Sequence, residues 1–160
     1  MEISLLTNTF SVRKAEKTDI ALIYDLCRKN DLFYQYHQPL VTRESILEDM
    51  ETLPPGKAKE DKYYLGFFEG EALVAVMDLI LAYPTKETAY IGFFMVDAGY
   101  QNQGIGSGLI NETLTYLKEM GYEKVRLGVD RGNPQSYAFW LKNGFAVIRE
   151  EKYILMESIL

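Results

Sequence analysis

The pattern of apolar and polar positions between residues 88 and 121 changes its period once, and this change marks the centre of the chain. In residues 88–96 both alternating sets are apolar, which is typical of a strand covered on both faces. From Gly104 onward the apolar positions follow a helical period, and Gly121 is placed to end that helix in the left-handed conformation. The stretch therefore predicts a buried strand, a polar turn rich in glycine and an amphipathic helix. Strand alternation places Ala89, Ile91, Phe93 and Met95 on one face, and Tyr90, Gly92, Phe94 and Val96 on the other.

The same patterns predict the remaining elements. Helices are expected at residues 18–29, with Thr18 or Glu16 as the N-cap, at 42–52, and at 133–144, where Asn133 is the N-cap and Pro134 the first helical residue. Strands are expected at residues 10–15, 62–69, 71–81, 123–130, 145–149 and 151–156, with a hairpin turn at Gly70. Pro54-Pro55-Gly56 predicts a surface loop.

Composition narrows the class of protein. The chain has 160 residues, of which 48% are apolar, so one domain spanning residues 1–160 is expected to bury a core without disulfides or a metal. The net charge of −6 and the lack of Lys/Arg clusters argue against nucleic acid and favour cationic partners, amines included. No apolar run is long enough to cross a bilayer and the start does not resemble a signal peptide, so a cytoplasmic protein without membrane contact is expected. The single cysteine, Cys27, is interpreted as a buried hydrophobic residue.

Residues 101–108 form the glycine-rich turn, Gln-Asn-Gln-Gly-Ile-Gly-Ser-Gly. Glycine inside a helix is about 1 kcal/mol less favourable than alanine, so three glycines at a helix start need a reason. One reason is that the unpaired N–H groups of the first turn bind an anion while glycine lets the ligand approach the backbone. The other is close packing of helix on sheet without any ligand. Two rival phosphate motifs fail, because Gly106 is followed by Ser107-Gly108 instead of the Lys-Ser/Thr of a P-loop, and Leu109 stands where a dinucleotide fingerprint needs its third glycine.

The motif Gln-x-x-Gly-x-Gly, with an apolar strand before it and Tyr100 four residues before the first glycine, resembles the acyl-CoA-binding signature of the GNAT superfamily of CoA-dependent N-acetyltransferases. Asn133-Pro134 and Lys142-Asn143-Gly144-Phe145 resemble the second signature of that family. The resemblance implies an α/β (α+β), GNAT-like fold: a mixed, largely antiparallel sheet of about six to seven strands, flanked by about four helices, with two strands splayed at the CoA site. It also implies acetyl-CoA as donor and a small-molecule or peptide amine as acceptor, with a homodimer as one option for assembly.

The resemblance assigns a role to each part of the site. The diphosphate of CoA is expected on the glycine-rich turn, and its amide-rich tail along the strand end, where a kink near Gly92 to Val96 would free backbone groups of Phe94 and Val96. The donor to the thioester carbonyl would be the N–H of Met95 or Val96. The aromatic segment between the first two helices is expected either to wall the acceptor site or to cover the sheet edge; its residues are Phe33, Tyr34, Tyr36 and His37. The expected cofactor-binding residues are Phe94, Met95, Val96, Gln101, Asn102, Gln103, Gly104, Ile105, Gly106, Ser107, Asn133 and Trp140.

The base and the acid of the reaction depend on residues that depart from the family pattern. An amine with a pKa near 10.4 is protonated at pH 7 and must lose a proton before it attacks a thioester. Asp78, inside an apolar strand, is a candidate base or acceptor contact, the alternative being a carboxylate satisfied by hydrogen bonds or a basic neighbour. Many relatives place a tyrosine seven residues after Asn133, where this chain has Trp140, and an indole N–H is no acid at neutral pH. Tyr137, one turn earlier, is the candidate acid, unless the thiolate leaves unassisted.

The sequence favours an N-acetyltransferase that works by direct transfer, without a covalent intermediate. A non-catalytic module that binds acyl-CoA is the second interpretation, because Trp140 replaces the family tyrosine. A nucleotide-binding α/β domain is the third, although both of its glycine fingerprints fail.

Overall fold

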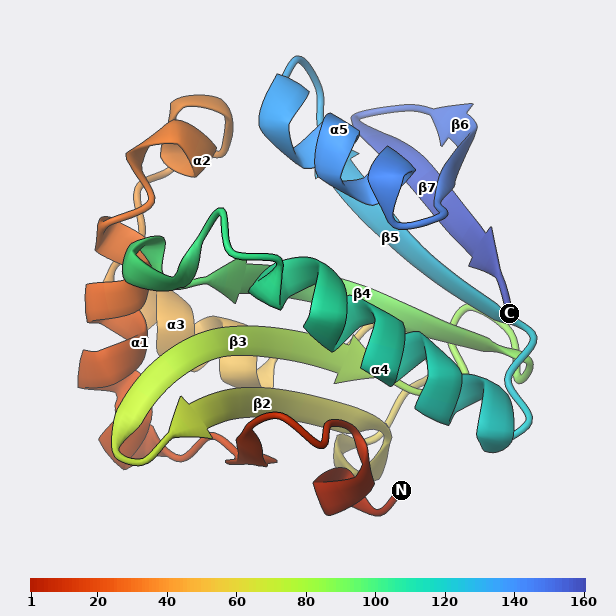
Figure 1. The fold of residues 1–160 in the computed structure, drawn as a ribbon. Coiled ribbons are helices and arrows are strands. Elements are labelled where there is room, and N and C mark those ends of the chain that lie inside the picture. The colour runs from red at the N-terminus through yellow and green to blue at the C-terminus, as the bar shows by residue number, and fades with distance from the viewer.

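The computed structural model describes residues 1–160 as an open, mixed sheet of seven strands with helices on both faces (Figure 1). Its order is β1-β2-β3-β4-β5-β7-β6, and every neighbouring pair is antiparallel except the parallel pair of β4 and β5. The strands are β1 (Ser11–Lys14), β2 (Lys62–Glu69), β3 (Ala72–Ile80), β4 (Thr88–Val96), β5 (Lys124–Asp130), β6 (Ala146–Glu150) and β7 (Tyr153–Ile159).

Five α-helices accompany the sheet. They are α1 (Ile20–Arg28), α2 (Asp31–Tyr36), α3 (Arg43–Glu51), α4 (Ile105–Glu119) and α5 (Pro134–Lys142). Helix α2 lies in the segment interpreted from the sequence as an aromatic connection, and its six residues are too few to display a helical period. The predicted caps are confirmed at α5, where Asn133 accepts from the N–H of Ser136, and at α4, where Gly121 has a φ of +94°.

Each face of the sheet has its own apolar core. Leu109 of α4 packs in the cluster that contains Met77 of β3, whereas Ile23 of α1 and Ile46 of α3 pack in the cluster that contains Val76. Val76 and Met77 are neighbours on one strand and therefore point to opposite faces. In Figure 1, α4 crosses the front of the sheet, while α1 and α3 lie along its other side. None of the helices has the length and apolarity needed to span a bilayer.

A β-bulge at Gly92 corrects the predicted alternation of β4. Asp78 of β3 pairs with Phe93 and the next residue, Leu79, pairs with Ile91, so Gly92 is an extra residue without a partner. Before it Ile91 faces the α4 core, but after it Met95 lies in the core of α1 and α3. The prediction that Ala89, Ile91, Phe93 and Met95 share one face was wrong, because one inserted residue exchanges the faces of all that follow. The predicted kink in this region is confirmed.

Strands β4 and β5 separate along their length. They pair only from Thr88 opposite Lys124 to Ile91 opposite Leu127, although β4 continues to Val96 and β5 to Asp130. In Figure 1 the two strands start together at the right and diverge toward the left, with the start of α4 on one side of the gap and α5 on the other. The separation begins at the bulge and produces the splay that the sequence resemblance implied.

Candidate active site

The N-terminus of α4 carries a set of backbone N–H groups without partners. Its N-cap is Gly104, at a φ of +77° and with no side-chain cap, and the first bond of the helix runs from the N–H of Gly108 to the carbonyl of Gly104 at 2.9 Å. The N–H groups of the residues between them make no hydrogen bond within the chain. Together with the helix dipole, these amides form an anion-binding end. A bound phosphate or pyrophosphate group would therefore fit here.

A cleft of about 360 Å³ lies over this helix end, between β4 and α5. A β-carbon at Gly106 would lie 3.3 Å from Phe139 of α5, so a side chain there would occupy the space between the two helices. Of the predicted cofactor-binding residues, ten line this cleft: Phe94, Met95, Val96, Gln101, Asn102, Gly104, Ile105, Gly106, Ser107 and Trp140.

Gln103 and Asn133, the other two predicted cofactor residues, do not line the cleft. The side chain of Gln103 donates to the carbonyl of Gly99 at 3.1 Å, on the outside of the turn. Asn133 is buried, and its side chain is used within α5, where it accepts from the N–H of Ser136 at 3.1 Å and donates to the hydroxyl of the same residue at 3.0 Å. Its observed contacts are those of a helix cap.

Gln101 connects the end of β4 to the end of α1. Its amide donates to the side-chain oxygen of Asn30 at 2.5 Å and to the backbone carbonyl of Val96 at 2.9 Å. Asn30 in turn donates to the same carbonyl at 3.4 Å. The expectation of a free carbonyl at Val96 was therefore wrong, because two side-chain amides already bond to it. Asn30 itself lines the cleft and was not among the predicted residues.

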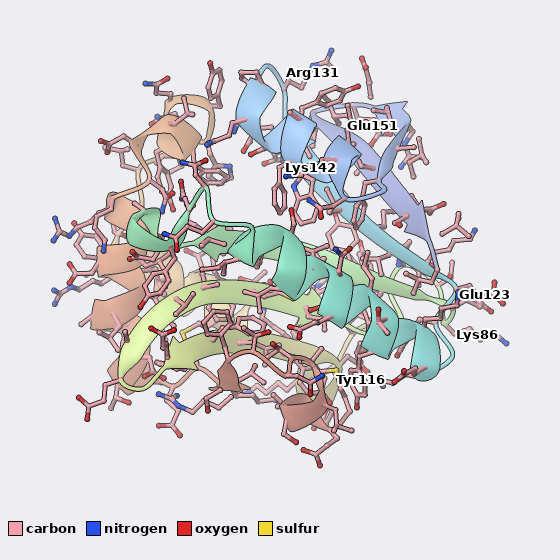
Figure 2. All side chains as sticks on the ribbon, in the orientation of Figure 1. Lys86, Tyr116, Glu123, Arg131, Lys142 and Glu151 are labelled. Carbon is pink, nitrogen blue, oxygen red and sulfur yellow. The ribbon has the colours of Figure 1, made fainter.

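Helix α5 contributes lining residues that the sequence reasoning missed. Gln135, Ala138, Phe139 and Lys142 follow one another at helical spacing and all line the cleft. Lys142, labelled on α5 in Figure 2, is the only basic side chain among the lining residues. Their spacing of three and four residues was the signal that could have identified them, once α5 was placed opposite the glycine-rich turn.

Trp140 occupies the junction of two cavities. Its indole packs edge-on against Phe139 and Phe145, with ring centroids 4.9 and 5.0 Å apart, and it lines both the cleft and a second cavity of about 280 Å³. Tyr137, the predicted acid, lies one turn before Trp140 on α5 and lines neither cavity.

The second cavity lies between the separated ends of β4 and β5. Its walls come from β4, from β5, and from Tyr153 of β7, and it shares Phe33, Phe94, Ser136 and Trp140 with the cleft. The two spaces therefore lie next to each other, with these four residues at their boundary. We call the first the cofactor cleft and the second the inner cavity.

The predicted acceptor residues lie in three places: the inner cavity, the core and the exposed surface. Phe33 and His37 line the cavity, and their rings stack at 5.0 Å. Tyr34 is buried in the core of α1 and α3, where burial raises the pKa of its hydroxyl. Tyr36 is exposed and lines neither space. Helix α2 thus faces the cavity on one side and the core of α1 and α3 on another.

Asp78 lies beside the inner cavity without lining it. Its carboxylate is buried and accepts from the Nζ of Lys62 at 2.9 Å, while its second oxygen has no partner. Burial raises the pKa of Asp78, against the opposing effect of Lys62. The carboxylate rests against Gly92, which does line the cavity. Asp78 is thus satisfied in part by a basic neighbour, one of the alternatives that the sequence left open.

Comparison with known proteins identifies the family of the chain. Residues 23–145 match the model of the acetyltransferase (GNAT) family. An uncharacterized N-acetyltransferase of Methanocaldococcus jannaschii is 27% identical over 97% of this chain and 67% of its own length.

Solved structures share the fold at lower identity. An acetyltransferase from Thermus thermophilus superposes with a TM-score of 0.81 at 21% identity, over 95% of this chain and 97% of that one. The PaiA N-acetyltransferase of Thermoplasma acidophilum, in complex with coenzyme A, gives 0.71 at 22% identity, over 95% and 99%. The ribosomal-protein-S18-alanine N-acetyltransferase of Escherichia coli gives 0.68 at 17% identity, over 93% and 92%.

These matches confirm the predicted fold class and the resemblance from which it came. The family model spans most of the chain and includes the cofactor cleft, the bulge of β4 and all of α4 and α5. The relatives named above are acetyltransferases, which supports an acyltransferase enzyme. The chain belongs to the acetyltransferase (GNAT) family.

Proposed function

We propose that the chain transfers the acetyl group of acetyl-CoA directly to a primary amine, on a small molecule or a peptide. One observation carries the proposal. The unpaired amides at the start of α4 line a cleft, and this cleft shares Phe94 and Trp140 with a cavity between two separated strands. A long anionic donor in the cleft and an acceptor in the cavity would therefore meet at these shared residues.

The residues of the cleft suit coenzyme A. The N–H groups of Ile105, Gly106 and Ser107 would hold the diphosphate, and Lys142 would contribute a positive charge to a phosphate. Phe94 and Met95 would lie along the amide-rich tail. The complex of the Thermoplasma acidophilum relative with coenzyme A supports this choice of ligand.

The inner cavity suits a cationic acceptor. It contains the carboxylate of Asp130 and the aromatic rings of Phe33, Phe93 and Tyr153, groups that attract an ammonium ion by charge and by cation–π interaction. The net charge of −6 would steer amines toward the protein at low ionic strength. The alanine N-acetyltransferase of Escherichia coli, one of the structural neighbours, supports an amino group as acceptor.

The position of the one thiol supports direct transfer. Cys27 is buried in the core of α1 and α3 and lines neither space, so it is not available as a covalent carrier. Positioning of amine and thioester in one site would then supply several kcal/mol of the barrier. The roles of Asp78 as base and of Tyr137 as acid stay predictions, because Asp78 lies behind the backbone of Gly92 and Tyr137 lines neither space.

The proposal is tested by binding and by turnover. Calorimetry with acetyl-CoA, CoA and NAD should give binding of the first two only. Release of free thiol should then follow addition of one of four acceptors: spermidine, lysine, an aminoglycoside, or a peptide with an N-terminal alanine. Binding of acetyl-CoA without turnover of any amine would favour a sensing module, and binding of NAD alone would favour a nucleotide-binding domain.

A further inference from the structure

His37 and Asp130 form a bonded pair across the inner cavity. His37 is the C-cap residue after α2, and Asp130 is the last residue of β5, 93 positions later in the chain. The Nδ1 of His37 lies 3.0 Å from one carboxylate oxygen of Asp130 and 2.9 Å from the other. The carboxylate is largely enclosed, with 14% of its side chain exposed, against 40% for the imidazole. The pair therefore fixes one histidine nitrogen and leaves the ring open to the cavity.

This contact determines which nitrogen is basic. An ionised carboxylate only accepts hydrogen bonds, so the Nδ1 of His37 must be the donor and must carry the proton. In a neutral imidazole the lone pair then lies on Nε2. That atom makes no hydrogen bond within the chain. Phe33 stacks on the ring at an interplanar angle of 29° and limits its rotation.

Few ionisable groups near His37 could act as the base in its place. Asp130 and Tyr153 are the other ionisable residues that line the inner cavity. From neighbouring elements, Asp49 of α3 interacts electrostatically with His37, and Tyr34 of α2 approaches its ring at 6.3 Å. The carboxylate of Asp78 is bonded to Lys62 and lies behind the backbone of Gly92.

We propose that His37, oriented by Asp130, is the base that deprotonates the acceptor amine. This inference rests on the proposed acetyl transfer. A proton moves from the ammonium group to Nε2, and the carboxylate of Asp130 stabilises the imidazolium that results. The neutral amine attacks the thioester carbonyl, forming the C–N bond as the C–S bond breaks. The second amine proton leaves with the sulfur as free thiol, and the imidazolium returns its proton to solvent.

The only histidine of the chain provides a test without any acceptor. Nitrogen NMR of the protein with ¹⁵N-labelled histidine should show, in the neutral ring, a protonated Nδ1 and an unprotonated Nε2. Asp130→Asn should abolish this preference, because an amide can donate to Nδ1 as well as accept from it. Protonation of Nε2 in the neutral ring of the unmodified chain would overturn the proposal.

Kinetics with the fastest amine of the panel provide the second test. His37→Gln should lower kcat by about 10²- to 10⁴-fold, the usual contribution of a general base, while CoA binding measured by calorimetry changes less than about twofold. Hydroxylamine, which is already mostly neutral at pH 7, should be acetylated by this variant almost as fast as by the unmodified chain. Gln35→Ala, an exposed position on the same helix, is the matched control and should leave both rates unchanged.

The outcomes separate the two proposals. If His37→Gln loses the rates with the ammonium substrate and with hydroxylamine equally, His37 has a structural role and is not the base. Full turnover of the ammonium substrate by His37→Gln would also show that His37 is not the base. If no amine reacts with the unmodified chain, the proposed function fails and the proposed base fails with it.

Discussion

A β-carbon on residue 92 would stand 2.8 Å from the Oδ2 atom of Asp78, closer than β-carbons come to other atoms in proteins. Gly92 is the bulge residue of β4 and faces the inner cavity, whereas Asp78 is buried on β3 and bonded to Lys62. The bulge at which β4 and β5 separate and the buried ion pair of Lys62 and Asp78 therefore both require a glycine at position 92.

Gly92→Ala should consequently destabilise the fold. The added methyl group must displace either the carboxylate of Asp78 or the backbone of β4, at an overpacking cost of about 1–3 kcal/mol in the free energy of unfolding. Urea denaturation measures this loss. Gly128→Ala is the matched control on the facing strand, since its nearest contact would be an ordinary 3.4 Å to Tyr153. Equal stabilities of the two variants would contradict the argument.

Removal of one partner of the Lys62–Asp78 pair should lower the stability of the fold more than removal of both. Lys62→Met leaves a buried carboxylate without its cation, and about 3–5 kcal/mol of stability should be lost at pH 7. The double variant, with Asp78→Leu added, should recover most of this loss, because two apolar groups replace the pair. If the two changes are additive in urea denaturation, the pair is not coupled.

The loss in Lys62→Met should also depend on pH. Burial already raises the pKa of Asp78, and removal of the lysine takes away the main effect that lowers it. A carboxyl whose pKa is higher in the folded state contributes most stability below its unfolded value of 3.8, and this contribution disappears as the pH rises through the folded value. The difference in stability between Lys62→Met and the unmodified chain should therefore be smaller at pH 4 than at pH 7 in urea denaturation. A difference that stays constant with pH would contradict the raised pKa of Asp78.

Gly106→Val should weaken CoA binding at least about tenfold, or about 1.4 kcal/mol, because its side chain would fill the space between α4 and Phe139. The change in fluorescence of the single tryptophan, Trp140, provides the measurement, since its indole lines the cleft. Gly108→Ala is the control, with no atom within 4 Å of the added carbon. It should retain CoA affinity and gain about 1 kcal/mol of stability. Normal affinity in Gly106→Val would place the diphosphate elsewhere.

Local signals account for the parts of the fold that the sequence predicted well. The cap at Asn133, the left-handed Gly121 and the change of period before α4 each depend on neighbouring residues only. The same holds for the glycine-rich turn, whose unpaired amides follow from the helix start itself. These features could be placed without knowledge of the sheet.

Long-range pairing explains what the sequence could not provide. The faces of β4 after Gly92 depend on how β3 pairs with it, and no periodicity within β4 shows an extra residue. Asp130 was read only as the end of a strand, because its partner His37 lies 93 positions away. Lys142 likewise became a lining residue only once α5 was placed across from α4.

The burial of Cys27 should make its thiol unreactive toward labelling reagents. Burial raises the pKa of this thiol from 9.0 to about 11, so only about one molecule in a thousand carries the thiolate at pH 8. Ellman's reagent should therefore not react with the folded chain at pH 8, and should react with one thiol per chain after denaturation in urea.

Because the folded pKa of Cys27 is the higher one, the proton on sulfur stabilises the fold below pH 9.0. About 3 kcal/mol of this stability should be lost as the pH rises to about 11. Tyr34 and Tyr64 act in the same direction, so the contribution of Cys27 is the difference from Cys27→Ala. Rapid labelling of the folded chain, or parallel pH profiles of the two proteins, would show that the thiol is open to solvent.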